Sequence, residues 1–302
     1  MRLTVCVTTF NRWEQCHNAV SSIFAQNSND FELIVVDDCS VKPIPKHFFD
    51  ELRARGARYL RHDANRGLAA ARNSAIQLAK GEFFAFCDDD DQWPPDFVDR
   101  ILYAFDSNSC DFGIVLALDV KRKRQCKSLF DSATNLTALM RAGFTPPVAS
   151  QAYKTELLRE IGGYRTEVSS GVDHDLWVSL ARTDPKVAVS WGEPAKVSAS
   201  PFRDRMTTVE LRRRAGIEKS LSIWRSDLCD VFGIDFFDYF VKSYQRYLDY
   251  NFFVKSMQRG ELLDAATRVI KNPYLLTRLL IRKIRKIFRT VDCSTFPKYN
   301  IK

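Results

Sequence analysis

Strand-type and helix-type segments alternate through the first hundred residues of this chain. Apolar, β-branched or aromatic runs of buried-strand length are separated by stretches whose apolar residues recur at helical spacing. The expected strands cover residues 2–10, 31–38, 57–62 and 82–87. The expected helical segments cover residues 11–26, 45–56, 65–80 (a loop and then a helix) and 95–105. This alternation predicts an α/β fold, a largely parallel sheet flanked by helices on both faces.

Polar clusters follow three of the expected strands. They occupy residues 8–12, 37–40 and 88–91, and the last is a run of four aspartates. Adjacent carboxylates repel one another, and a solvated acidic turn is the ordinary explanation of such a run. A divalent cation would instead draw the carboxylates together and lower their pKa values. Ligands of parallel sheets bind at the carboxyl ends of strands, so the coincidence of three clusters there favours the metal site.

Charge divides the chain unevenly. Residues 203–302 hold 21 Lys and Arg against 11 Asp and Glu, whereas residues 1–202 hold 24 against 26. The pattern after residue 202 is helical and rich in aromatic residues. We therefore expect an α/β domain over residues 1–202 and a helical, basic extension over residues 203–302. A basic surface of this kind suits a polyanion, either a nucleic acid or an anionic membrane.

The last helical segment of the extension is amphipathic. Five apolar residues share one face (Leu276, Leu280, Ile284, Ile287 and Val291), and four arginines share another (Arg278, Arg282, Arg285 and Arg289). Lys283 falls within the apolar stripe, which disfavours tight packing on the domain but suits a lipid surface, where lysine can snorkel. We expect an interfacial membrane helix, with a helix packed on the domain as the alternative. Nucleic acid is not expected as a partner, because no recognition motif accompanies the charge.

Other features point to a cytosolic protein. The chain has no run of eighteen apolar residues, so no transmembrane helix is expected, and its N-terminus looks like a strand rather than a signal peptide. The eight cysteines form no C-x-x-C pair, which predicts reduced thiols. The four histidines lack zinc-type spacing.

Five segments carry a resemblance to a known family. They read "VTTFNR", "ELIVVDDCS", "NRGLAAARN", "GEFFAFCDDDDQWPP" and "GVDHDLW", in this order over roughly residues 1–200. In order and spacing they resemble the inverting nucleotide-sugar glycosyltransferases of GT-A type, family two. The resemblance implies a Rossmann-like GT-A domain that moves a sugar from a nucleotide diphosphate to a hydroxyl group.

The resemblance also implies how the donor is held. Asp38 would accept hydrogen bonds from the base, which favours uracil or thymine over cytosine because their ring N–H is a donor. We expect UDP-linked donors more than dTDP-linked ones. The alternative is that Asp37 and Asp38 merely cap the next turn, and for Arg72 it is a surface charge on an Ala-rich helix. The other residues implied beside the nucleotide sugar are Thr8, Phe10 and Arg12 at the first strand end, and Asn65, Gly67 and Arg72 in the third segment.

The aspartate run matches the family's D-x-D motif. Asp90 would bind Mn²⁺ or Mg²⁺ with Asp88 assisting, and Asp89 would contact the ribose. Both cations accept hard oxygen ligands, and the diphosphate supplies those that the protein does not. Asp91 has no required role in this scheme. A histidine that some members use as a further ligand is missing from residues 198–206.

The "VDHDLW" segment supplies the implied catalytic base. Asp173 would take the proton of the acceptor hydroxyl, which is otherwise a poor nucleophile. Val172 stands where the family often has Glu, and Asp175 is expected to cap the helix that follows. Trp93, His174 and Trp177 are expected on the acceptor or sugar side.

Together these features predict a metal-dependent, inverting glycosyltransferase. Its acceptor would be a glycan or lipid-linked glycan of cell-surface polysaccharide biosynthesis, reached from the cytoplasm at the inner face of the membrane. A sugar-phosphate nucleotidyltransferase is one alternative, but "TTFNRWEQ" lacks the glycine-rich phosphate loop that it needs. A non-catalytic sugar-nucleotide binding protein is another, and the presence of both Asp90 and Asp173 argues against it.

Overall fold

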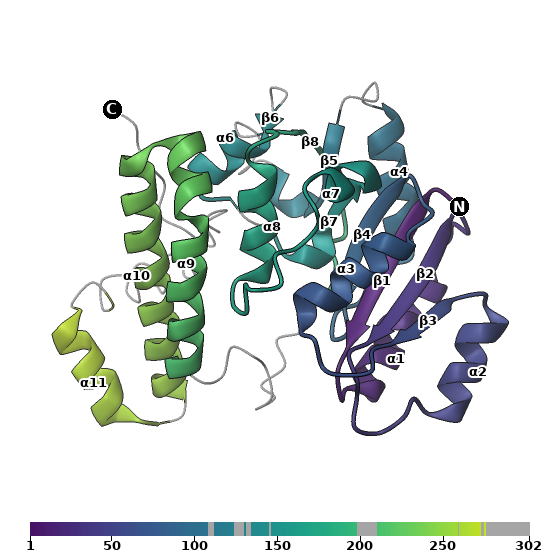
Figure 1. The fold of residues 1–302 in the computed structure, drawn as a ribbon, viewed down its shortest axis with the longest axis horizontal. Helices are drawn as coiled ribbons and strands as arrows, with labels where there is room; N and C mark the ends of the chain where they lie inside the picture. The colour runs from purple at the N-terminus through teal and green to yellow at the C-terminus, as the bar shows by residue number, and fades with distance from the viewer. Residues whose placement is uncertain are drawn as a thin grey trace.

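A computed structural model describes residues 1–107, 112–123, 130, 134–144, 146–197, 210–258, 260–272 and 275. Eight strands within these residues form one sheet, in the order β3-β2-β1-β4-β7-β5-β8-β6 (Figure 1). Their bounds are β1 Leu3–Thr9, β2 Phe31–Asp37, β3 Arg58–Arg61, β4 Phe83–Asp88, β5 Phe112–Asp119, β6 Thr134–Asn135, β7 Gln151–Lys154 and β8 Lys186–Gly192.

The sheet is largely parallel, as the alternation predicts. Strands β3, β2, β1 and β4 run parallel to one another, and β5 runs parallel to β8. Strand β7 is antiparallel to both β4 and β5, and β6 is antiparallel to β8. The register pairs Thr9 with Asp37 and Thr8 with Asp88. The polar ends of β1, β2 and β4 therefore meet at one edge of the sheet.

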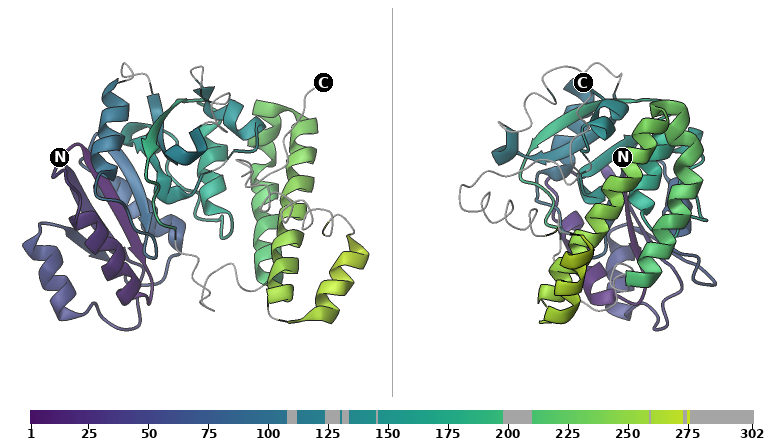
Figure 2. Two further views of the ribbon diagram at one scale, coloured as in Figure 1. Left: turned by 180° about the vertical axis from the view of Figure 1, so that it is seen from behind. Right: turned by 90° about the vertical axis from the view of Figure 1, so that its left-hand side faces the viewer.

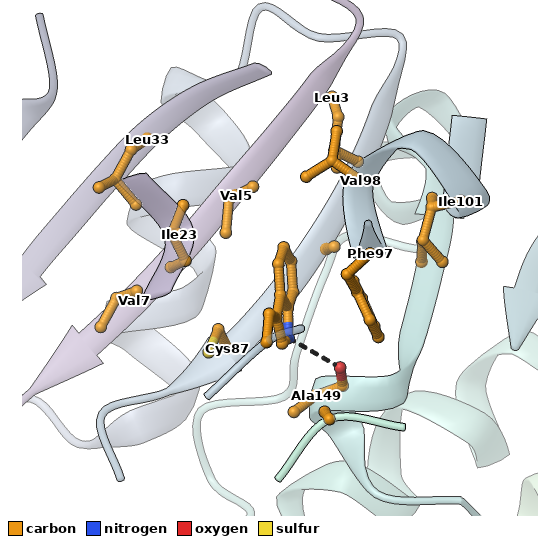
Figure 3. Packing of buried hydrophobic residues seen from close by; sticks show 14 of the residues in the cluster. Leu3, Val5, Val7, Ile23, Leu33, Cys87, Phe97, Val98, Ile101 and Ala149 are labelled. Atoms are coloured by element: carbon orange, nitrogen blue, oxygen red, sulfur yellow. Dashed lines mark hydrogen bonds between the residues drawn. The ribbon is translucent and has the colours of Figure 1, made fainter. Parts of the chain in front are cut away.

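Helices cover both faces of the sheet, because alternate side chains of each strand point to opposite sides. One face packs Leu3, Val5 and Val7 of β1 against α1 (Trp13–Phe24), α2 (Lys46–Ala54) and α4 (Phe97–Ser107). Figure 3 shows part of this core, with Phe97, Val98 and Ile101 of α4 beside the strands. The other face packs Cys6 of β1 against α3 (Leu68–Leu78), α6 (Leu136–Arg141), α7 (Thr155–Glu160) and α8 (Val172–Leu180).

The described part of the extension is helical. Helices α9 (Glu210–Phe232) and α10 (Ile234–Gln258) run side by side, and the chain turns between them at Gly233, whose φ is +87° (Figure 2). Helix α11 (Leu262–Lys271) follows. A third apolar cluster joins Trp224 and Leu228 of α9 to Val178 of α8, so the extension packs directly on the domain.

The amphipathic segment 276–291 lies outside the described residues. In the part of the chain that the structure describes, no helix is long and apolar enough to span a membrane.

Candidate active site

Two arginines neutralise much of the aspartate run at the end of β4. Arg12, just after β1, makes ion pairs with Asp89 (Nη1 to Oδ1, 2.8 Å) and with Asp90 (Nη2 to Oδ2, 2.8 Å). The hydroxyl of Thr9 donates to the other oxygen of Asp89 at 2.9 Å. Burial raises the pKa of Asp89 to about 7, although Arg12 and the Thr9 hydroxyl act in the opposite direction. The run is therefore not a solvated turn: it is partly buried and held by its neighbours.

Arg72 links this run to the segment that carries Asp173. Its guanidinium donates from Nη2 to Asp88 Oδ1 at 2.8 Å and from Nη1 to Asp173 Oδ1 at 2.6 Å. Arg72 is fully buried on α3, between the rings of Phe86 and Tyr164, whose centroids lie 5.1 and 5.2 Å from Cζ. The alternative of a surface charge is therefore wrong. Burial alone would lower the pKa of Arg72, but the surrounding Tyr164, Asp173 and Asp88 hold it above its ordinary value.

Asp38 organises the loop before α3. One carboxylate oxygen accepts from the backbone N–H of Arg66 (2.9 Å) and contacts His62 Nδ1 (2.7 Å). The other oxygen accepts from the backbone N–H of Gly67 at 2.7 Å, and Gly67 has a φ of +86° that favours glycine. Asn65 donates to the Asp38 carbonyl at 3.2 Å. Asp38, Asn65 and Gly67, which the sequence predicts beside the nucleotide, thus belong to one hydrogen-bonded unit.

Asp37 has a different role from Asp38. Its Oδ1 accepts from the backbone N–H of Ser40 at 2.8 Å, and its Oδ2 accepts from Tyr59 and from Arg61. Turn capping, the alternative considered for both aspartates, therefore describes Asp37. Of the two remaining residues predicted at the first strand end, Thr8 is buried beside Asp88 and Phe10 is 42% exposed.

Asp173 lies in the first turn of α8, and its side chain is 48% exposed. The helix begins at Val172, after Gly171 in the left-handed conformation. Asp175 is therefore inside the helix and fully buried, where it accepts hydrogen bonds from Arg165 Nε (2.7 Å) and Trp224 Nε1 (2.8 Å). The expectation that Asp175 caps α8 is wrong, because the cap position precedes it by four residues.

The three residues expected on the acceptor side occupy other places. Trp93 is buried in the core, where its Nε1 donates to the Ala149 carbonyl at 3.0 Å, the hydrogen bond drawn in Figure 3. Trp177 is buried on the opposite face of the sheet and donates to Gln151 at 2.7 Å. His174 packs against the Tyr244 ring, and burial lowers its pKa to about 4, so it is neutral at pH 7. We therefore assign none of the three to acceptor binding.

The donor set at the end of β4 suits a hard cation. Asp88 and Asp90, two residues apart, each make an ion pair of 2.8 Å with an arginine. Carboxylate oxygens are the ligands that Mg²⁺ and Mn²⁺ take, and a bound diphosphate can complete the shell. Among the described residues no group of three or more His, Cys, Asp or Glu side chains is placed to hold a metal by itself.

Residues 4–128 match the family model described as "Glycosyl transferase family 2". This N-terminal part of the chain is therefore similar to that family. A relative named for colanic acid biosynthesis, the glycosyl transferase WcaA of Escherichia coli, is 35% identical over 31% of this chain and 34% of its own. The teichuronic acid biosynthesis glycosyltransferase TuaG of Bacillus subtilis is 31% identical over 36% and 44%. An uncharacterised glycosyltransferase of Haemophilus influenzae is 24% identical over 64% and 66%. The chain thus spans less than two thirds of each of these curated relatives.

Two solved structures share the fold of this chain. Staphylococcus aureus TarS 1–349 in complex with UDP-GlcNAc superposes with a TM-score of 0.62 and 18% identity, covering 77% of this chain and 68% of that one. The mannosyltransferase PcManGT of Pyrobaculum calidifontis, in complex with GDP-Man and Mn²⁺, gives 0.60 and 19%, covering 96% and 88%. At these identities the likeness establishes the fold, and it confirms the predicted GT-A class.

Sequence reasoning missed the contacts that join these segments. The hydrogen bonds of Arg72 to Asp88 and Asp173, and those of Asp175 to Arg165 and Trp224, all connect residues that lie far apart in the chain or in different elements. For the Arg72 contacts, the sequence offered one signal, the presence of a basic residue and of two acidic motifs among the conspicuous segments. No signal in the sequence indicated the second.

Proposed function

We propose that this protein is a family 2 glycosyltransferase that moves a sugar from a nucleotide diphosphate to an acceptor hydroxyl in one displacement, with inversion at the anomeric carbon. Asp173 is the base. The proposal rests on one observation: a single guanidinium, that of Arg72, bonds both the Asp173 carboxylate and the carboxylate of Asp88 at the strand ends. Because Asp173 is half-exposed, an acceptor hydroxyl can reach it while the donor lies over β1 and β4.

The donor is proposed to be a UDP-sugar, and dTDP is the second choice. Support comes from the loop that Asp38 organises at the end of β2, where the backbone N–H of Asp38 donates to the carbonyl of Thr9 of β1 at 2.9 Å. Each carboxylate oxygen has two lone pairs, so Asp38 can hold this loop and still accept from a uracil N–H. The fold does not choose the nucleotide, since solved relatives carry UDP-GlcNAc in one case and GDP-Man in another.

The reaction is proposed to need Mn²⁺ or Mg²⁺, held by Asp90 and Asp88. When bound, the cation would stabilise the negative charge that develops on the leaving diphosphate. Arg12 is placed to orient this end of the site, because its guanidinium already fixes Asp89 and Asp90. Asp89 is proposed to contact the ribose.

The acceptor is proposed to be a glycan or lipid-linked glycan of cell-surface polysaccharide synthesis. Support comes from relatives named for colanic acid and teichuronic acid biosynthesis. The basic sequence of residues 203–302 supports work at the cytoplasmic surface of an anionic membrane. Removing residues 273–302 should reduce co-sedimentation with phosphatidylglycerol vesicles, and equal binding by both proteins would contradict this part of the proposal.

The Asp173→Asn variant tests the mechanism. The amide keeps the shape of the side chain but cannot take a proton, so turnover should fall by ~10²–10⁴-fold, the usual worth of a general base. UDP affinity in calorimetry should hardly change, which marks an interaction used in the transition state. Asp230→Asn is the matched control, because Asp230 is also about half-exposed (56%) and paired with an arginine, Arg182, at 2.9 Å. Near-normal turnover of Asp173→Asn, or a product that retains the donor's configuration, would refute the assignment.

A nucleotidyltransferase or a non-catalytic binding protein would give different results. The first would release diphosphate from a nucleoside triphosphate and a sugar phosphate. The second would bind a UDP-sugar without releasing UDP. No contact in the described part of the chain favours either of them over sugar transfer.

A further inference from the structure

One face of helix α9 is pressed against the loop that leads into α8. Gly216, Ser220 and Trp224 recur every four residues and so share this face. We call these three residues the α9 stripe. A Cβ atom at Gly216 would lie 2.9 Å from the Cβ of Ser170, so only glycine allows the helix to approach this closely. The Ser220 hydroxyl donates to the Ser170 carbonyl at 2.7 Å.

Trp224 of α9 contacts the chain both before and after the start of helix α8. Its ring lies so near to Gly171 that a Cβ there would come within 2.9 Å of Cη2, and Gly171 has a φ of +76°. Its indole N–H donates to Asp175 Oδ1 at 2.8 Å. Arg165 holds the same carboxylate and also pairs with Asp227 of α9 at 2.7 Å. The α9 stripe therefore contacts the chain at residues 170–171 and again at residue 175.

Asp173 lies between these two points. The contacts of α9 with Ser170, Gly171 and Asp175 fix the backbone on both sides of Asp173. Arg72 of α3 fixes its carboxylate through an ion pair. Ser220, Trp224 and Asp175 are fully buried, and their hydrogen bonds give these contacts a direction that apolar packing lacks. A hydrogen bond depends steeply on distance and angle. Small displacements of a reacting group cost large factors in rate.

We propose that the α9 stripe is a positioning device for Asp173, so that the helical extension completes the active site. The inference rests on the proposed function, because it assumes that Asp173 is the base. It concerns residues beyond 4–128, the part of the chain that matches the family model. Ser220 and Trp224 act through Ser170 and Asp175 and do not themselves touch substrate.

Ser220→Ala and Trp224→Phe test the proposal. Each removes one donor and keeps most of the packing. We expect turnover per folded molecule to fall by about 10- to 100-fold, in line with a misplacement of about an ångström. Turnover is followed as UDP release from UDP-glucose, UDP-galactose and UDP-GlcNAc with Mn²⁺. The Kd of UDP, measured by calorimetry, should stay within twofold, because the stripe does not contact the strand ends.

Two further variants separate positioning from general damage. Ser220→Thr keeps the hydroxyl and should retain most of the turnover. Ser222→Ala is the matched control, since Ser222 lies on the exposed side of the same helix and bonds only locally, to the Lys219 carbonyl at 2.8 Å. Amide hydrogen exchange of residues 170–176 should accelerate in Ser220→Ala and Trp224→Phe and stay unchanged in Ser222→Ala.

The outcomes distinguish this inference from the proposed function. If Asp173→Asn keeps its turnover, the base assignment fails and this inference fails with it. If Asp173→Asn loses turnover while Ser220→Ala and Trp224→Phe stay within twofold of the unmodified protein, only the positioning role is overturned. A loss of UDP binding in step with turnover overturns it as well, because that result indicates general damage to the fold.

Discussion

Replacing Arg72 by methionine removes the link between the aspartate run and Asp173 while it keeps an unbranched side chain between the two rings. Two hydrogen bonds to charged partners are lost, each worth ~1.5–3 kcal/mol when buried. The lower end applies, because Asp88 and Asp173 are 35% and 48% exposed and water can replace part of the interaction. The contacts of the guanidinium with the rings of Phe86 and Tyr164 add ~0.5–1 kcal/mol.

We therefore expect Arg72→Met to lower the free energy of unfolding by ~3–4 kcal/mol, measured by urea denaturation followed by circular dichroism. Arg2→Met is the control. Arg2 also makes two hydrogen bonds to one carboxylate, Asp106 (2.9 and 2.7 Å), and also lies over a ring, that of Phe83. Its side chain is 36% exposed and Asp106 is 55% exposed, so the loss should stay below ~1 kcal/mol. Equal losses in both variants would refute the view that burial gives the Arg72 link its strength.

Three further predictions concern the donor side. Chelation with EDTA should abolish transfer, Mn²⁺ should restore it, and Asp90→Ala should weaken UDP binding in calorimetry with Mn²⁺; full activity after chelation would contradict the metal site. UDP should bind more tightly than GDP or CDP if Asp38 reads the base, and the reverse order would sink that assignment. Because burial raises the pKa of Asp89 to about 7, the native state keeps a proton that the unfolded state loses above pH ~4. The free energy of unfolding should therefore fall by at most ~4 kcal/mol between pH 4 and 7. Urea titrations of Asp89→Asn should show a smaller decline, although the raised pKa of Asp88 acts in the same direction and keeps part of it. An unchanged slope would exclude Asp89 as a source of the decline.

The sheet and the location of the site follow from patterns that are local in sequence. Strands β1 to β4 were recognisable from their own apolar runs, whereas β6, β7 and β8 were not predicted. The polar residues that end β1, β2 and β4 meet because parallel strands in register end together. The side of the sheet that a residue faces is harder to obtain. Trp93 and Trp177 stand next to acidic motifs, yet both point into the core, on opposite faces.

Helix starts and long-range contacts were the least accessible features. The sequence favoured Asp175 as a cap because it precedes an apolar run, but Gly171 can take the left-handed conformation and lets α8 begin earlier. The sequence placed Arg72 beside the nucleotide sugar, with a surface charge on an alanine-rich helix as the alternative, and gave no sign that the side chain is buried. Its burial arises because α3 lies beneath Tyr164, a contact between residues about ninety positions apart that no local pattern contains.

The charges around the site explain why four carboxylates can lie together. Two guanidinium groups, those of Arg12 and Arg72, make ion pairs with Asp88, Asp89, Asp90 and Asp173. When all four carboxylates are ionised, their negative charges exceed the positive charges of the two guanidinium groups by two. The raised pKa values of Asp88 and Asp89 have burial as their main cause and the neighbouring carboxylates as a further one, so the excess is felt within the site. A proton can relieve part of it, whereas a divalent cation matches it and also suits the diphosphate that must bind there. The arginines thus allow the aspartates to fold close together, and the charge that they leave over is what we expect Mn²⁺ or Mg²⁺ to use.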